Sequence, residues 1–100
     1  MKYRYYVHNR KENVGITEFA TENVTLFAEC LCDCINWFMF ECDDTLHYEF
    51  YVHYGDNKFL ITFSFDNEDN MVAYFCNTDN VSTVYREDIR DFVKSRNWEV

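Results

Sequence analysis

The 100-residue sequence contains no proline, no glutamine and only two glycines, Gly15 and Gly55. Asn, Asp, Phe and Tyr are abundant instead. This bias is typical of an AT-rich coding sequence, so we expect a low-GC bacterium or one of its phages as the source.

The sequence also lacks a long apolar run. The most apolar stretch, residues 26–40, is interrupted by Glu29, Asp33 and Asn36, which makes it too polar to span a bilayer. The first residues alternate in polarity and contain no apolar core of a signal peptide. Five cysteines in a chain without an export signal favour reduced thiols. We therefore expect a cytoplasmic protein of a bacterium or phage, with no membrane partner.

Positive charge is scarce, and the formal net charge is −9. No Lys or Arg occurs between Lys11 and Lys58. That interval contains ten acidic residues: Glu12, Glu18, Glu22, Glu29, Asp33, Glu41, Asp43, Asp44, Glu49 and Asp56. Bare nucleic acid and anionic membranes are bound through Lys and Arg, so this chain would be repelled by both. The composition predicts a partner protein with a basic surface; solubility alone is the alternative role of the charge.

Motifs for catalysis and for metal binding are missing as well. The chain has no Gly-rich phosphate loop, nucleophile elbow or His-Glu-x-x-His pattern. In the run Cys30-Leu31-Cys32-Asp33-Cys34, a helix would place Cys30 and Cys34 on the core face and turn Cys32 away. The three thiols could not then ligate one ion, so we interpret them as small core hydrophobes. We predict no metal, no cofactor and no enzymatic activity.

What the chain does have is enough apolar material for one core: 48% of its residues are hydrophobic and 20% are aromatic. We predict that residues 1–100 form a single α+β domain. Its two layers are an antiparallel sheet of three to five strands and two helices on one face, in the order β(β)αβββα. The periodicities place strands at 3–8, 46–54, 58–66 and 71–76 and an optional one at 14–19. They place one helix from about Glu22, with Thr21 as its N-cap. A second helix runs from about Ser82 or Arg86 to Asn97.

The alternation of apolar residues also restricts the length of the turn between the strands at 46–54 and 58–66. Directly opposed residues share a face, and the inward positions are even before the turn and odd after it. A two-residue turn at Gly55-Asp56 satisfies this rule, as would a four-residue loop. The two-residue turn sets Tyr51 opposite Leu60 on the outer face, with Tyr74 on the next strand. These three residues are candidate anchors for a partner, unless another element covers them, such as the C-terminal segment with Trp98.

Two acidic loops are expected at the same end of the sheet, because one precedes a strand and the other follows its antiparallel neighbour. Together they carry six carboxylates: Glu41, Asp43, Asp44, Asp66, Glu68 and Asp69. Such a cluster can stand in for the phosphates of a nucleic acid, remain a solvated loop end, or bind a cation. The spacing of a calcium-binding loop is absent, which argues against the cation.

The predicted αβββα order resembles that of double-stranded-RNA-binding domains, and the last helix carries a basic stripe at Arg86, Arg90 and Lys94. Those domains place a basic cluster at the start of that helix, where this chain has Glu87 and Asp88. We therefore expect no direct binding of nucleic acid. The opening Met1-Lys2-Tyr3-Arg4-Tyr5 resembles the first strand of HicB-type antitoxins, although the Leu-Pro-Gly-Cys turn of that family is missing.

Our leading hypothesis is a small acidic inhibitor that blocks the basic nucleic-acid-binding site of another protein. Phage anti-restriction and anti-CRISPR proteins, other DNA mimics and nuclease immunity proteins act in this way. The alternatives are a self-associating structural or regulatory subunit, antitoxin-like and homodimeric, joined through residues 37–40 or the outer sheet face, and a small metal-dependent enzyme.

Overall fold

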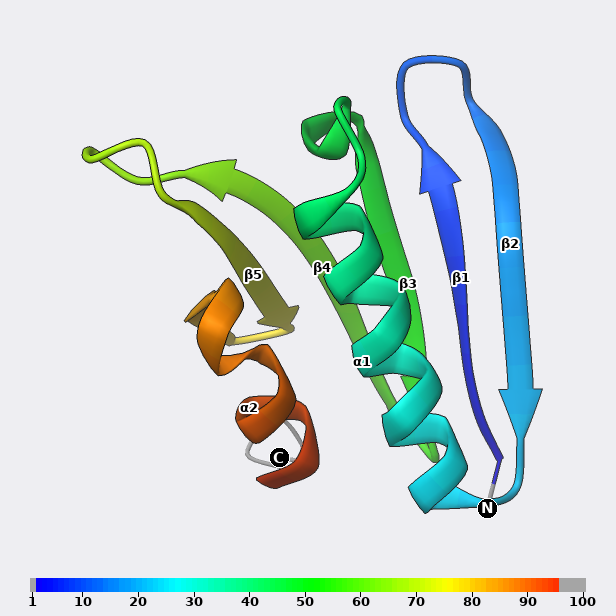
Figure 1. Cartoon of the computed structure of the whole chain (residues 1–100). Coiled ribbons are helices and arrows are strands. Elements are labelled where there is room, and N and C mark those ends of the chain that lie inside the picture. Colours follow the sequence, from blue (N-terminus) through cyan, green and yellow to red (C-terminus); the bar gives the residue numbers. More distant parts are fainter. Residues whose placement is uncertain (1, 96–100) are drawn as a thin grey trace.

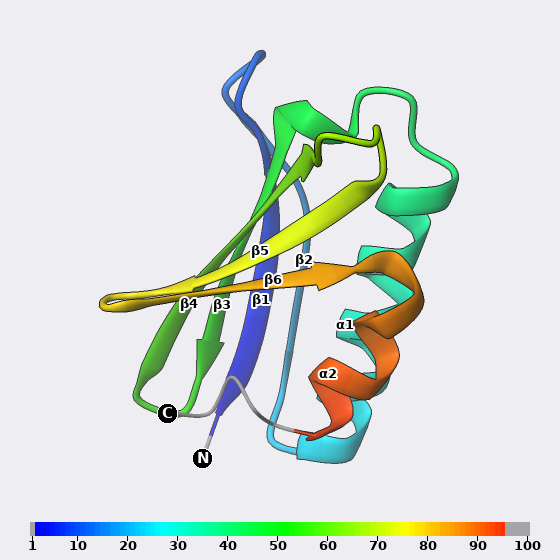
Figure 2. The ribbon, with the colours of Figure 1, turned by 90° about the vertical axis from the view of Figure 1, so that its left-hand side faces the viewer.

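The computed structural model describes residues 2–95 and places six strands in one antiparallel sheet with two helices on one face (Figures 1 and 2). The elements are β1 (Tyr3–Asn9), β2 (Val14–Thr21), α1 (Val24–Phe40), the 3-10 turn η1 (Thr45–His47), β3 (Tyr48–Tyr54), β4 (Asn57–Phe65), β5 (Met71–Asn77), β6 (Asn80–Tyr85), the 3-10 turn η2 (Arg86–Asp88) and α2 (Ile89–Ser95). The predicted α+β class is confirmed. The predicted strand number was too low.

The sheet order is β2-β1-β3-β4-β5-β6. Four of the five strand pairs are consecutive hairpins, whereas α1 connects β2 to β3 across the sheet and lets β3 pair with β1. In that pair Tyr5 lies opposite Val52, and His8 lies opposite Glu49. Side chains of β1 and β3 are neighbours on the outer face of the sheet because these two strands pair.

Alternate strand residues point toward the helices and form the core. The inward positions of the central strands are almost fully buried: Val7, Phe50, Val52, Phe59, Ile61 and Phe63. From α1 the core receives Phe27, Leu31, Ile35 and Phe38. Phe50 contacts both Phe38 and Phe63 edge-on, at ring-centroid distances of 5.5 and 5.8 Å. Burial of these apolar side chains drives the packing of α1 on the sheet.

The hairpin between β3 and β4 has the two-residue turn, one of the two loop lengths that the alternation allowed. Tyr54 pairs with Asn57, and Tyr51 pairs with Leu60. Gly55 has φ 61°, which suits the first central position of a type II′ turn and is disfavoured for residues with a Cβ.

Strand β6 corrects the prediction that the C-terminal helix could start at Ser82. Ser82 pairs with Phe75 and Val84 pairs with Ala73, and Val84 is 4% exposed. The segment alternates between the two faces and is rich in Val, Thr and Tyr, which favour strands. Because these six residues extend the sheet, the last helix starts at Ile89, and within the described residues it is Ile89–Ser95.

The start of α1 also differs from the prediction. Asn23 is the N-cap, and its side-chain oxygen accepts a hydrogen bond from the Leu26 amide at 3.0 Å. Thr21 is the last residue of β2, and its hydroxyl oxygen accepts from the Asn23 amide. Asn is as good a cap as Thr, so the end of the strand decides the position.

One predicted side-chain orientation is corrected. Cys32 is fully buried, because α2 packs on the side of α1 that the sheet does not cover; Cys30 and Cys34 are half-buried. Phe65 lies on the same face of β4 as Phe63, opposite Met71, but at the last position of the strand it is 47% exposed. Within residues 2–95, no helix has both the length and the apolar character needed to cross a membrane.

Candidate partner-binding surfaces

Charge is unevenly divided between two parts of the chain. The N-terminal hairpin, β3 and the start of β4 carry five basic residues (Lys2, Arg4, Arg10, Lys11, Lys58) and four acidic ones (Glu12, Glu18, Glu49, Asp56). The rest of the described chain carries three basic residues (Arg86, Arg90, Lys94) and thirteen acidic ones (Glu22, Glu29, Asp33, Glu41, Asp43, Asp44, Asp66, Glu68, Asp69, Asp79, Glu87, Asp88, Asp91). The net negative charge therefore belongs to the helices, the loops that flank them, and the β4–β5 and β5–β6 loops.

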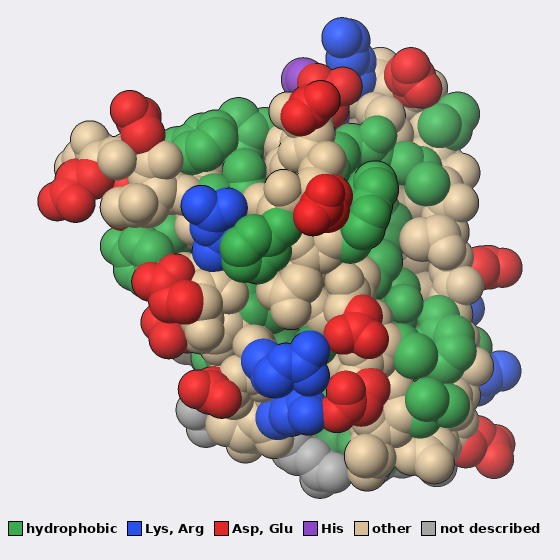
Figure 3. Space-filling view, in the orientation of Figure 1, with side chains coloured by type: hydrophobic (Ala, Val, Ile, Leu, Met, Phe, Trp, Pro, Cys, Tyr) green, Lys and Arg blue, Asp and Glu red, His purple; other side chains and the backbone are tan. Residues whose placement is uncertain are grey.

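The six carboxylates singled out in the sequence form two clusters. Glu41, Asp43 and Asp44 follow α1, in the segment we call the α1–β3 loop; Asp66, Glu68 and Asp69 lie in the β4–β5 loop. Both loops lie at the same end of the sheet, but Figure 1 shows them apart, with the β4–β5 loop projecting beyond the helices. Figure 3 shows several separate groups of acidic side chains on the helix side, with apolar and basic side chains between them.

The α1–β3 loop is fixed to the C-terminal end of α1. The Glu41 amide donates to the Trp37 carbonyl at 2.8 Å. The hydroxyl of Thr45, which is 1% exposed, lies 2.5 Å from the Phe38 carbonyl and 2.8 Å from the Cys42 carbonyl. These bonds hold the three exposed carboxylates of the loop beside the negative end of the helix dipole, where acidic groups are unfavourable.

Two aromatic side chains are exposed at this same helix end. Trp37 is 54% exposed and Phe40 is 58% exposed, whereas Phe38 and Met39 between them are buried. The guanidinium of Arg86 lies over the Phe40 ring at 4.9 Å and donates to the Met39 carbonyl at 3.4 Å. Of the apolar residues at 37–40, the structure therefore leaves two on the surface, next to the acidic loop.

The β4–β5 loop uses one of its carboxylates internally. Asp66 accepts hydrogen bonds from the amides of Glu68 and Asn70, at 2.8 and 2.9 Å, and these bonds lower the pKa of Asp66, with the Asn70 amide as the largest cause. The Tyr85 phenol interacts with Asp66, Glu68 and Glu87, which raise its pKa. Glu87, which was not among the six carboxylates singled out in the sequence, thus joins this cluster.

Two carboxylates of α1 are paired with the basic stripe of α2. Arg90 lies 3.4 Å from a Glu29 oxygen and 3.2 Å from an Asp33 oxygen, and Lys94 pairs with Glu29. Arg90 and Lys94 therefore offset acidic residues of α1. Among residues 2–95, no group of three or more His, Cys, Asp or Glu side chains could hold a metal ion.

The outer face of the sheet brings together the predicted apolar anchors. Tyr51 lies opposite Leu60, and Tyr74 lies across from Thr62 on the same face. Tyr6 of β1, which the sequence analysis did not select, stacks on Tyr51 with ring centroids 4.8 Å apart and planes 13° apart. No element of the described chain covers this face (Figure 2). Trp98, proposed as a cover, lies outside the described residues.

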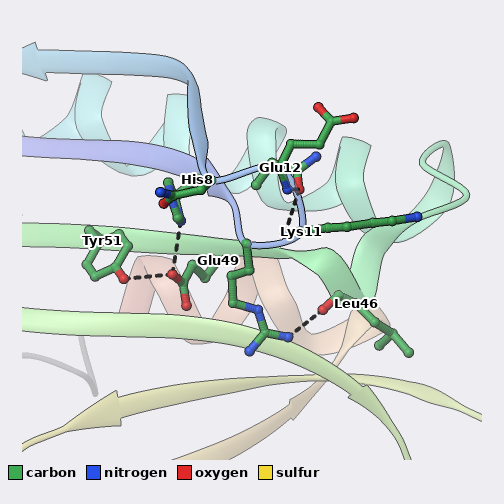
Figure 4. Close-up of polar contacts among 9 residues, drawn as sticks. His8, Lys11, Glu12, Leu46, Glu49 and Tyr51 are labelled. Atoms are coloured by element: carbon green, nitrogen blue, oxygen red, sulfur yellow. Dashed lines mark hydrogen bonds and ion pairs between the residues drawn. The ribbon is translucent and has the colours of Figure 1, made fainter.

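Beside this stack, Glu49 is 7% exposed although it lies on the outer face (Figure 4). Its Oε1 accepts a hydrogen bond from the Tyr51 hydroxyl at 2.6 Å and lies 3.2 Å from His8 Nδ1. The bond to Glu49 is the main cause that raises the pKa of Tyr51 to about 12, and burial adds to it. The Tyr51 hydroxyl is therefore used within the chain, and its ring is what remains for a partner.

Comparisons with protein-family models, with curated proteins and with solved structures gave no match.

Proposed function

We propose that this protein is a stoichiometric inhibitor, without catalytic activity, that docks its acidic side on the basic nucleic-acid-binding surface of another protein. The observation that supports this proposal is the division of charge, with thirteen acidic and three basic residues on the helices, on the loops that flank them, and on the β4–β5 and β5–β6 loops. Such a surface attracts a basic protein and repels nucleic acid. Within it, Asp43, Asp44 and Glu68 are exposed to solvent and available to a partner.

The proposed mechanism has two stages. The negative side steers the protein toward a basic groove and raises the association rate, an effect that salt weakens. Apolar contacts then set the dissociation rate. By occupying the groove, the protein excludes nucleic acid from it. We place this activity in the cytoplasm of a bacterium, with a phage gene as one origin.

The test uses the full-length chain immobilised on a resin and exposed to extracts of low-GC bacteria. The variant Asp43→Lys/Asp44→Lys/Glu68→Lys changes the acidic side. The control Glu12→Lys/Glu18→Lys/Asp56→Lys makes the same change in net charge at exposed positions elsewhere. We expect the wild type and the control to retain a nucleic-acid-binding protein that the first variant releases. Equal capture by all three chains, or capture of proteins that bind no nucleic acid, would overturn the proposal.

A further inference from the structure

We propose that the C-terminal end of α1 receives an arginine side chain of the partner protein, stacked on Trp37 and paired with Glu41. This inference rests on the proposed function and names the contact that gives it affinity. The site consists of Trp37, Phe40, Glu41 and the acidic residues of the α1–β3 loop.

The exposed stripe of α1 carries acidic residues in its N-terminal half and aromatic residues in its C-terminal half. It runs through Leu26, Glu29, Asp33, Trp37 and Phe40 at helical spacing. In its N-terminal half the acidic residues are already paired with Arg90 and Lys94. In its C-terminal half two aromatic rings, each more than half exposed, stand next to carboxylates that have no ion pair within residues 2–95.

The electrostatic field at this end favours a cation. The last turn of α1 contains no basic residue, and its carbonyls form the negative end of the helix dipole. Glu41, Asp43 and Asp44 add three charges of the same sign directly after the helix. Like charges at this position lower stability, and a bound cation relieves the repulsion.

The chain itself shows which cation fits. Arg86 places its guanidinium over the Phe40 ring and donates to a carbonyl of the last turn. Trp37 is a better acceptor for such stacking than Phe, and among the described residues no cation lies over it. Glu41 is four residues beyond Trp37 and still has helical backbone angles, so the two side chains are neighbours on the helix surface.

An arginine satisfies this pair of groups better than a lysine. Its planar guanidinium stacks on an indole and can donate two parallel hydrogen bonds to a carboxylate, whereas an ammonium group acts as a point charge. Arginine is also common on surfaces that bind phosphate groups, which agrees with the proposed partner.

The experiment measures the fluorescence anisotropy of fluorescein-labelled hexa-arginine and hexa-lysine peptides on addition of the full-length protein. We expect hexa-arginine to bind at least about threefold more tightly than hexa-lysine, and Trp37→Ala or Glu41→Gln to remove that preference. Leu26→Ala, at the other end of the same exposed stripe, is the matched control and should change nothing. Arg86→Gln should strengthen hexa-arginine binding, because it frees Phe40 and the helix end.

The outcomes separate this inference from the proposed function. Equal binding of the two peptides, or Trp37→Ala with unchanged affinity, overturns the arginine site. If Asp43→Lys/Asp44→Lys/Glu68→Lys still weakens both peptides in that case, the attraction of cations to the acidic side stands. If neither set of variants changes binding, both proposals fail.

Discussion

Replacement of Thr45 by Val tests how the α1–β3 loop is held on the helix. The hydroxyl of Thr45 reaches the carbonyls of Phe38 and Cys42, and the side chain is 1% exposed. Valine has the same shape as threonine but no hydrogen-bond donor. The carbonyls therefore lose the bond from Thr45 at a position that water does not reach. Such a loss destabilises a protein by about 1–3 kcal/mol. For a domain of this size, 2 kcal/mol corresponds to a decrease in Tm of about 10 °C.

Thr45→Ser is the matched variant, because it keeps the donor and removes one methyl group. Loss of a buried methyl costs about 0.8 kcal/mol, so the serine variant should be more stable than the valine variant. Urea unfolding at pH 7, followed by far-UV circular dichroism, gives both free energies. Hydrogen exchange should also accelerate at the amides of residues 41–47 in the valine variant. A valine variant as stable as the serine variant would refute the role assigned to the hydroxyl.

Three further predictions concern titratable groups. Glu49→Gln should lower the pKa of Tyr51 from about 12 toward 10, measured by NMR of ring-labelled tyrosine; an unchanged pKa would show that Glu49 is not its cause. Burial first, and two neighbouring cations second, lower the pKa of His53, so the fold favours the neutral ring. Stability should therefore fall as the pH drops through about 6.5, the unfolded value, and His53→Gln should reduce that fall in urea unfolding at pH 7 and pH 5. Burial raises the pKa of the Cys32 thiol to about 11, so iodoacetamide at pH 8 should alkylate Cys32 in urea much faster than in the native protein, as peptide mass spectrometry can show.

The sheet was largely predictable because its central strands alternate strictly. The parity of their apolar positions excluded a three-residue loop and allowed the turn at Gly55-Asp56, which pairs Tyr51 with Leu60. Strand β6 was missed because its six residues are mostly exposed and carry a weak apolar pattern, and the helix after it has only seven residues. Weak local signals of this kind are decided by packing against the rest of the fold.

The candidate surfaces were predictable only in part, since they depend on contacts between distant segments. The sequence predicted that both acidic loops lie at one end of the sheet. It did not predict the distance that separates them. The pairing of Arg90 with Glu29 and Asp33 depends on where α2 packs. The contact of His8 with Glu49 depends on the pairing of β1 with β3, which are separated by a hairpin and a helix.

The most direct measurement is a competition between this protein and duplex DNA for the captured partner, made from about 50 to 300 mM NaCl. We expect the two ligands to exclude each other and the affinity of the wild type to decrease steeply with salt. The variant Asp43→Lys/Asp44→Lys/Glu68→Lys should bind more weakly and depend less on salt. A ternary complex with DNA, or an affinity that does not change with salt, would contradict the proposed function.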